Sequence, residues 1–262
     1  MSGRYRHLYP WQILTTRFHV PLTCRLDRAY DGDELRKECE AILSTFRLRG
    51  QHGDDHAGGW RAIGLIAPDG DPYEDRQLDE RPHLKTPVLA MSPYLQRVID
   101  GFGCETRRVR LMQLLPGERV LWHFDSSESI DRANARVHVP IVTNAGVRFQ
   151  ISHEDCRWRP GELWYGDFSF PHRLHNTGSE GRIHLVLDLK VTDVVRSLFP
   201  REFLDSVKQR ARLRGLVQAM VGLYTLPRYR IGYMKTRQAR FVRERTDLEA
   251  SRPGTAGETD RA

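Results

Sequence analysis

Hydrophobic and polar residues alternate in several short runs through the middle of the chain, which is the pattern of strands with one buried face. From residue 105 onward these runs follow one another closely. Turn residues such as Pro116-Gly117 and Asn144-Ala-Gly146 separate them. Short strands with turns between them favour a closed or sandwiched β-fold of the jelly-roll kind. The predicted strands are residues 106–115, 118–122, 136–143, 147–152, 162–167 and 182–190.

Helices and further strands are predicted ahead of this β-rich part. Inward-facing Leu, Cys and Ile positions predict a helix over residues 33–46, and Ser92-Pro93 begins another that ends near Gly101. Alternation in residues 18–26 and the apolar run at 60–67 predict two more strands. The sequence therefore predicts a mainly β protein with flanking helices.

The C-terminal part has a different pattern. After Thr192 apolar residues recur at helical spacing among basic ones, and we expect Pro227 to interrupt this helix. The last residues are small and polar, which is typical of disorder. The expected organisation is a domain over residues 1–190 with its core at 105–190, a basic helical extension over 191–250 and a disordered tail over 251–262.

The positive charge of the chain is concentrated in this extension. The net charge is +7, and residues 201–245 contain twelve Lys or Arg against three Asp or Glu, so the remainder is close to neutral. Such a segment is usually a solvated face, but it could dock on an acidic partner or a membrane surface. We find no apolar run of the ~20 residues that a membrane span needs. Four cysteines without C-x-x-C spacing and the absence of a secretory signal favour a reduced, cytoplasmic protein.

Candidate metal ligands follow the second strand of the β-rich part. His123 and Asp125 are two residues apart, so at a strand end both side chains lie on one face. The pair is common by chance, and the alternative is a half-buried histidine hydrogen-bonded to the aspartate. The candidates for a third ligand are His172, His175 and His184, and we favour His172 because it stands at a strand-to-loop corner. Two imidazoles and one carboxylate are the ligand set of non-haem Fe(II) oxygenases.

Two arginines suggest an anion clamp beside this metal. Arg182 lies in an apolar strand, where an unpaired arginine is costly to bury. It could form a salt bridge with Asp188 or Glu162, or its fork could bind a carboxylate at two points. Arg136 and His138 share one strand face and could bind a second carboxylate. A diacid with an α-keto group fits this arrangement, and 2-oxoglutarate is such a molecule.

Over roughly residues 60–190 the chain resembles the aspartyl/asparaginyl β-hydroxylase family, which includes bacterial proline hydroxylases and some lipid hydroxylases. The resemblance rests on four segments in this order: LLPGERVLWHFD, RVHVPIVTN, GELWYGDFSFPH and RIHLVLD. It implies a double-stranded β-helix of the jelly-roll or cupin type, to which the residue pattern adds helices packed outside and the helical extension. Residues 1–59 and the extension from about Val191 lie outside the resemblance.

The resemblance also implies roles for single residues. The implied Fe(II) ligands are His123, Asp125 and His172, and the implied 2-oxoglutarate residues are Arg182, Arg136 and His138. Asp125 stands where some members, with an incomplete triad, have Gly. Met112 stands where those relatives have a serine that contacts the cosubstrate.

These observations predict an Fe(II)- and 2-oxoglutarate-dependent hydroxylase of an amino acid or peptidyl residue, which uses O2 and releases succinate and CO2. One alternative is a lipid or fatty-acyl hydroxylase of the same family that docks on membranes through its basic extension. A metal-dependent isomerase without 2-oxoglutarate would not need two cationic clamps. A non-enzymatic protein that binds RNA or another acidic partner through residues 201–245 is the remaining alternative.

Overall fold

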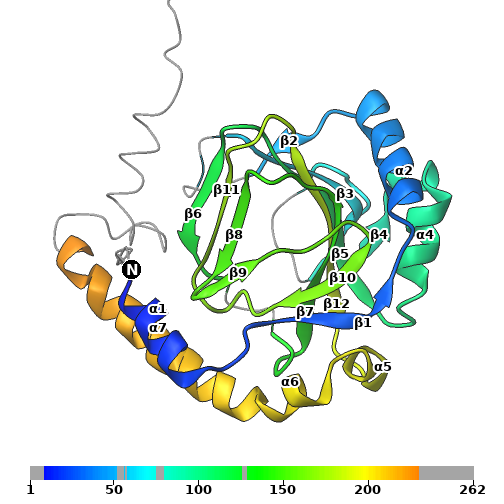
Figure 1. Ribbon diagram of the computed structural model, residues 1–262. Helices are drawn as coiled ribbons and strands as arrows, with labels where there is room; N and C mark the ends of the chain where they lie inside the picture. The colour runs from blue at the N-terminus through cyan, green and yellow to red at the C-terminus, as the bar shows by residue number, and fades with distance from the viewer. Residues whose placement is uncertain (1–8, 52–55, 57, 75–79, 126–128, 230–262) are drawn as a thin grey trace, which may run out of the picture.

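The structure, a computed structural model, describes residues 9–51, 56, 58–74, 80–125 and 129–229. Within them, two antiparallel sheets face each other and form a barrel (Figure 1). In order across the sheet, the larger one contains β1 (Thr23–Ala29), β10 (Glu162–Gly166), β7 (Asn134–Val142), β12 (Arg182–Lys190), β5 (Thr106–Leu114), β3 (Trp60–Pro68) and β2 (Arg49–Gly50), with β4 (His83–Lys85) also paired to β3. The smaller one contains β6 (Arg119–His123), β11 (His172–Asn176), β8 (Val147–Ile151) and β9 (Glu154–Cys156). This is a double-stranded β-helix, and the predicted fold class is confirmed.

The outer face of the larger sheet is covered by two helices, α2 (Gly32–Thr45) and α4 (Pro93–Asp100), with the short α3 (Pro87–Ala90) beside them (Figure 1). Strand residues such as Leu111 and Leu187 belong to the same buried cluster as Ile42 of α2 and Val98 of α4. Side chains alternate between the two faces of a strand. The residues directly before and after each of these leucines in its strand therefore point into the barrel.

Both covering helices begin where the sequence predicts. Asp31 caps α2, and its side chain accepts hydrogen bonds from the backbone N–H groups of Asp33 and Glu34. Ser92 precedes the first residue of α4, Pro93, whose fixed φ suits the first turn of a helix. The bounds of both helices are confirmed within one residue, but the predicted cap Ser92 makes no capping hydrogen bond with its side chain.

The turn between β5 and β6 carries the chain from the larger sheet to the smaller one. The N–H of Glu118 donates to the carbonyl of Leu115, and Gly117 has a φ of 78°. Proline followed by a residue with positive φ is the arrangement of a type II turn, and glycine adopts that φ without a steric penalty. This turn sets the path of β6, whose last residue is His123.

The smaller sheet is covered by α1 (Pro10–Phe18) and α7 (Val207–Tyr229), which lie side by side in Figure 1. Trp11 of α1 and Val217 of α7 share a buried cluster with Trp122 of β6. The sequence did not predict α1, although Pro10 stands at its first turn and the Gln12 side chain accepts a hydrogen bond from the Tyr9 N–H.

Two local predictions are wrong. The strand expected over residues 18–26 begins only at Thr23, because the chain first completes α1 and turns at His19 in a left-handed conformation. The helix expected to stop at Pro227 continues to Tyr229. A proline removes one intrahelical hydrogen bond, and α7 continues past it nevertheless.

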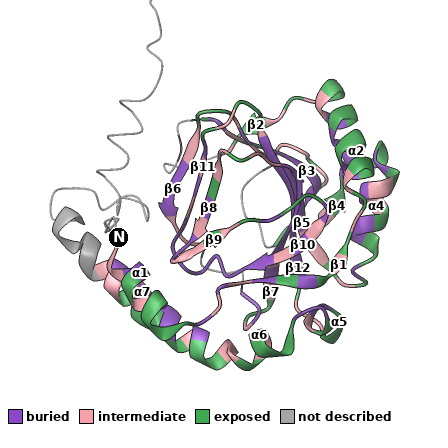
Figure 2. Cartoon of the chain, in the orientation of Figure 1, coloured by how far each residue is buried: buried purple, intermediate pink, exposed green. Residues whose placement is uncertain are grey.

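The C-terminal extension is packed against the barrel. Short helices α5 (Asp193–Ser197) and α6 (Arg201–Asp205) lead into α7, and Phe203 joins the core of the larger sheet. Figure 2 shows exposed residues along the outer side of α7, as expected for a solvated face. That expectation is wrong for Arg210 and Arg214, which are buried. Residues 230–245, with half of the basic side chains of the 201–245 segment, and the expected disordered tail lie outside the described residues.

Among the described residues, no helix is both long and apolar enough to cross a membrane. The apolar residues of α7 alternate with arginines, lysine and glutamine, and its buried side faces the barrel.

Arg214 joins α7 to two loops at one end of the barrel. Its guanidinium donates to both carboxylate oxygens of Asp131 at 2.9 Å and to Asp167 at 3.1 Å. It also donates to the hydroxyls of Ser129 and Ser169 at 2.8 and 2.5 Å. A buried charge with this many partners ties α7 to the loop between β10 and β11.

Replacement of Arg214 is therefore expected to destabilise the whole protein. Arg214→Met leaves the buried carboxylate of Asp167 without its hydrogen-bonded cation and with only Arg210 at 3.9 Å. Loss of one partner of a buried ion pair typically costs about 3–5 kcal/mol of unfolding free energy. Arg212→Met on the exposed side of the same helix is the matched control and should change stability by less than about 0.5 kcal/mol. Denaturant unfolding of both variants tests this, and equal effects would contradict the role given to Arg214.

Candidate metal centre and anion site

The three predicted ligands lie together at one end of the barrel. His123 is the last residue of β6 and His172 the first of β11, and the antiparallel pairing of these strands places the two residues opposite each other. Asp125 follows two residues after β6, and its N–H donates to the carbonyl of Phe168 at 2.8 Å. The ligand atoms of the three side chains lie within 4.8 Å of one another. Such a spacing allows all three to contact one metal ion.

Backbone carbonyls orient both imidazoles. The Nδ1 atom of His123 lies 2.8 Å from the carbonyl of Leu121, and that of His172 lies 3.1 Å from the carbonyl of Phe170. A carbonyl only accepts, so each Nδ1 carries the proton and each Nε2 keeps its lone pair. This second hydrogen bond fixes the ring orientation in most histidine metal sites.

The charge state of the triad also suits a cation. Burial and the neighbouring His123 lower the pKa of His172 to about 3, so this imidazole is neutral at physiological pH. Burial alone would raise the pKa of Asp125, but the charge of Arg136 lowers it below its usual value. The neutral imidazole of His172 and the carboxylate of Asp125 are therefore both in the form that binds a cation.

The two other histidines considered as third ligand are not part of this cluster. His175 lies three residues further along β11, half-buried, with Arg119 as its register partner. His184 is buried in β12, and its Nδ1 accepts a hydrogen bond from Arg182 at 2.7 Å.

Arg182 is buried inside the barrel without a carboxylate partner. Its side chain is 1% exposed, and its guanidinium carbon lies 5.3 Å from the ring centre of Phe149 in the opposite sheet. Among the described residues, its Nε and Nη1 have no hydrogen-bond partner, and neither Asp188 nor Glu162 pairs with it. Burial lowers its pKa to about 9. An uncompensated buried cation is costly, so the site is suited to an anion.

His138 extends this site on the neighbouring strand β7. Its Nδ1 lies 3.4 Å from that of His184, and the rings of Phe168 and Trp158 lie 4.9 and 5.4 Å away between centres. Its Nε2 is buried and has no partner within the described part of the chain. Burial and the charge of Arg182 hold the pKa of His138 well below its usual range, so the ring is neutral.

Arg136 connects the metal ligands to Asp188. It donates to both oxygens of Asp188, at 2.6 and 3.0 Å, and to one oxygen of Asp125. The second oxygen of Asp125 stays available to a metal. The predicted contact of Arg136 with a cosubstrate carboxylate stays a prediction.

The sequence analysis missed two further arginines around Asp188. Arg108 and Arg110 of β5 are both buried and lie 3.4 and 3.6 Å from the same carboxylate oxygen. The sequence contained the information needed to find them, because two arginines at alternate positions of an apolar strand must point to one face. Met112, next on that face, packs with Ala62 and Val186 instead of offering a hydroxyl.

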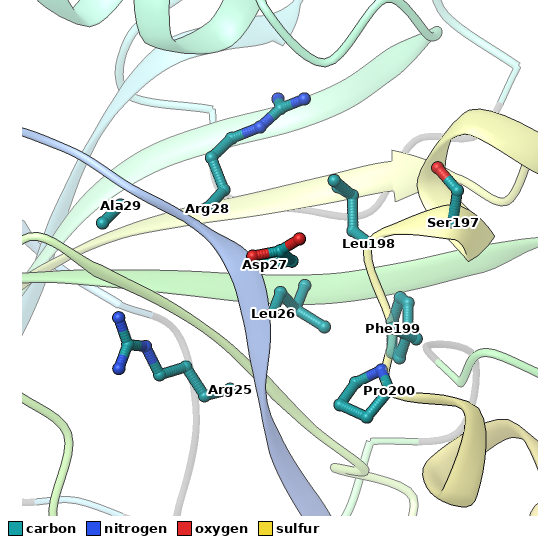
Figure 3. Close-up of a pocket in the computed structure, with 9 residues that line it drawn as sticks. All are labelled: Arg25, Leu26, Asp27, Arg28, Ala29, Ser197, Leu198, Phe199 and Pro200. Atoms are coloured by element: carbon teal, nitrogen blue, oxygen red, sulfur yellow. The ribbon is translucent and has the colours of Figure 1, made fainter.

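A separate pocket of about 580 Å³ lies outside the barrel, between β1 and the segment that joins α5 to α6. Figure 3 shows its lining, residues 25–29 and 197–200, with Arg25 and Arg28 on either side of the strand. Arg25 pairs with Glu162, and Arg28 donates to the carbonyl of Gly101. The pocket contains no triad residue, and its arginines are already paired.

The chain combines a double-stranded β-helix with two histidines and one carboxylate that can bind one face of a metal ion. Fold and ligand set together place it in a class of metal-binding β-barrel proteins. The model of the aspartyl/asparaginyl β-hydroxylase family matches residues 31–191. The chain therefore belongs to this family, and the predicted resemblance is confirmed.

Three individual proteins are similar to this chain. An L-proline cis-4-hydroxylase from Rhizobium meliloti (strain 1021) is 28% identical over 189 residues, which are 71% of this chain and 65% of that protein. The chain thus spans slightly less than two thirds of the length of this curated relative. A 2OG-Fe(II) oxygenase family oxidoreductase from Burkholderia pseudomallei is similar over 74% of this chain and 95% of its own, at 13% identity and a TM-score of 0.46. A prolyl-4-hydroxylase from Pseudomonas putida is similar over 70% and 99%, at 14% identity and a TM-score of 0.40.

Proposed function

We propose that this protein is an Fe(II)- and 2-oxoglutarate-dependent hydroxylase that acts on an amino acid or peptidyl residue. With O2 it would convert 2-oxoglutarate to succinate and CO2. The observation that carries the proposal is a His-Asp-His triad in the same barrel as a buried arginine, Arg182, which has no counter-ion among the described residues. Membership of the aspartyl/asparaginyl β-hydroxylase family supports it.

The side chains inside the barrel fit both Fe(II) and 2-oxoglutarate. His123, Asp125 and His172 would hold Fe(II), since this ligand set leaves coordination positions open for small ligands. Arg182 would bind the distal carboxylate of 2-oxoglutarate through its Nε and Nη1, and the Nε2 of His138 lies in the same buried region. Hydrogen bonds between a guanidinium and a carboxylate are charge-assisted, and they are stronger than hydrogen bonds between neutral groups.

When bound, iron and 2-oxoglutarate supply the oxidative chemistry, and the chain supplies binding and orientation. The carbonyls of Leu121 and Phe170 hold the two imidazole rings in place. Arg136 holds the carboxylate of Asp125, and the rings of Phe168 and Trp158 close around His138 and exclude water. Exclusion of water strengthens every electrostatic interaction of the site.

An amino acid or a residue in a peptide is the substrate class that we favour. The curated relative is named for hydroxylation of L-proline, which supports this choice.

All four cysteines of the chain are free. Free thiols suit a reducing compartment such as the cytoplasm, where we expect the protein to act.

No observation in the described residues favours the lipid or acidic-partner alternatives. Both require accessible positive charge on the extension, to which Arg210 and Arg214 do not contribute because they are buried. Arg214 is paired with Asp131 and Asp167, and Arg210 packs against the ring of Phe203 at 3.6 Å.

The proposal predicts succinate release that depends on substrate. The protein, reconstituted with Fe(II), should release succinate from 2-oxoglutarate faster when a free amino acid such as L-proline is present, and the product should gain one oxygen atom. Mass spectrometry of a panel of amino acids and short peptides measures both. His172→Ala is the control without activity. Tight binding of iron and 2-oxoglutarate without stimulation by any member of the panel would contradict the proposed substrate class.

A further inference from the structure

The loop between β10 and β11, residues 167–171, holds two of the three metal ligands through its backbone. The carbonyl of Phe168 accepts a hydrogen bond from the N–H of Asp125 at 2.8 Å, and the carbonyl of Phe170 lies 3.1 Å from the Nδ1 of His172. The loop leads directly into His172, the first residue of β11. The path of this loop therefore sets the separation between a carboxylate ligand and an imidazole ligand.

The residues that alternate with the two phenylalanines belong to a buried polar network. Asp167 and Ser169 are both 0% exposed, as is Ser129 in the loop that follows the ligand Asp125. The hydroxyl of Ser169 donates to one oxygen of Asp167, and the hydroxyl of Ser129 donates to the other at 3.1 Å. The backbone N–H of Asp167 donates to the carbonyl of Leu22 at 2.8 Å. Side chains and backbone thus fix the first half of the loop together.

Arg214 of α7 is the member of this network that contacts all the others. Its Nε donates to Ser169, and its Nη2 donates to Ser129 and Asp167. Its Nη1 and Nη2 also bind the two oxygens of Asp131, each at 2.9 Å. A serine hydroxyl has one proton and can accept as well as donate. Since both hydroxyl protons point to Asp167, both hydroxyl oxygens are free to accept from Arg214, and donors and acceptors match.

We propose that Arg214 is a positioning residue of the metal centre: it fixes the loop of residues 167–171 and, through that loop, the separation between Asp125 and His172. This inference rests on the proposed function. The family model matches residues 31–191, which include all three ligands but not α7. The support for the ligands therefore comes from a part of the chain that lies outside the matched region.

The physical reason is the buried charge of Asp167. Without Arg214, the nearest remaining cation of the network is Arg210, whose Nε lies 3.9 Å from that carboxylate. A buried carboxylate without a close partner is costly, so the loop must move to hydrate it. Such a movement displaces the carbonyls of Phe168 and Phe170, which orient the ligands. Loss of a group that orients a metal ligand typically lowers metal affinity about 10- to 100-fold.

Metal binding tests this inference independently of turnover. Anaerobic titration measures the affinity for Fe(II), and the visible absorption of the Co(II)-loaded protein reports the number and geometry of the ligands. Folded Arg214→Met should bind Fe(II) about 10- to 100-fold more weakly and have an altered Co(II) spectrum. Arg214→Lys keeps the charge but not the planar fork, so its affinity should lie between those of the native protein and Arg214→Met. Ser169→Ala removes one partner of Arg214 and should give a smaller decrease.

Two controls separate positioning from a loss of stability. Ile42→Ala opens a cavity in the core under α2, on the outer face of the larger sheet, so it should destabilise the protein and keep native Fe(II) affinity at temperatures where circular dichroism shows it folded. Arg212→Met, on the exposed side of α7, should keep native affinity and the native Co(II) spectrum.

The outcomes are distinct. Native affinity and an unchanged spectrum in folded Arg214→Met, or an equal loss of affinity in Ile42→Ala, would overturn the inference and leave the proposed function standing. If Arg214→Met does not fold, Arg214→Lys and Ser169→Ala decide by the same two measurements, and native values in both would overturn the inference. A native protein that binds neither Fe(II) nor Co(II) would contradict the proposed function and the inference together.

Discussion

His123→Ala and His172→Ala are each expected to abolish Fe(II) binding. The ligand atoms of the triad lie within 4.8 Å of one another, and each imidazole is already oriented by a backbone carbonyl. Loss of a partner that only orients a ligand typically lowers metal affinity about 10- to 100-fold, so loss of a ligand itself should lower it by more than about 100-fold. Anaerobic titration with Fe(II) measures the effect.

His175→Ala is the matched control for this experiment. It lies on the same strand as His172 but is not part of the cluster. We expect it to bind Fe(II) like the native protein, while circular dichroism should show all three variants to be folded. Full iron occupancy in His172→Ala would show that the triad is assigned incorrectly.

The strands of the barrel were predictable because their burial pattern repeats every two residues. Strand β12 was predicted over residues 182–190, which are its observed bounds, and the Pro116-Gly117 turn was predicted at its observed place. Helix α4 carries an explicit start signal at Pro93, and the inward-facing apolar residues of α2 predicted its bounds within one residue. Local chemistry decides these elements, so the sequence alone contains the necessary information.

Elements stabilised by distant contacts were harder to predict. Helix α1 is short, and it is held by Trp11, which packs in the cluster shared with α7 and β6. Strand β11 contains His172 and His175 among polar neighbours, and its partners β6 and β8 hold it through backbone hydrogen bonds. Tertiary contacts override weak local preference in both cases.

The candidate site was only partly predictable for the same reason. Spacing brought His123 and Asp125 together, and the residue pattern already favoured His172 before the family resemblance assigned roles to it and to Arg182. The partner of each arginine was not predictable, because several carboxylates compete for it. Asp188, one of two partners considered for Arg182, lies with Arg136 instead. Because Asp188 pairs with Arg136, Arg182 has no carboxylate partner among the described residues.

Arg182→Ala is expected to weaken binding of 2-oxoglutarate while iron binding survives. The native guanidinium is buried beside Phe149 and lies outside the metal triad, and two of its nitrogens have no partner in the part of the chain that the structure describes. Removal of one charge-assisted pair should raise the dissociation constant by an amount equivalent to about 1.5–3 kcal/mol, which is about 10- to 150-fold. Arg182→Lys keeps the charge but not the planar fork of the guanidinium, so its dissociation constant for 2-oxoglutarate should lie between those of the native protein and Arg182→Ala. Anaerobic calorimetry on the Fe(II)-loaded proteins measures the constants. An unchanged constant in Arg182→Ala would assign the distal carboxylate to another residue, while a joint loss of iron and 2-oxoglutarate would indicate a structural role for Arg182.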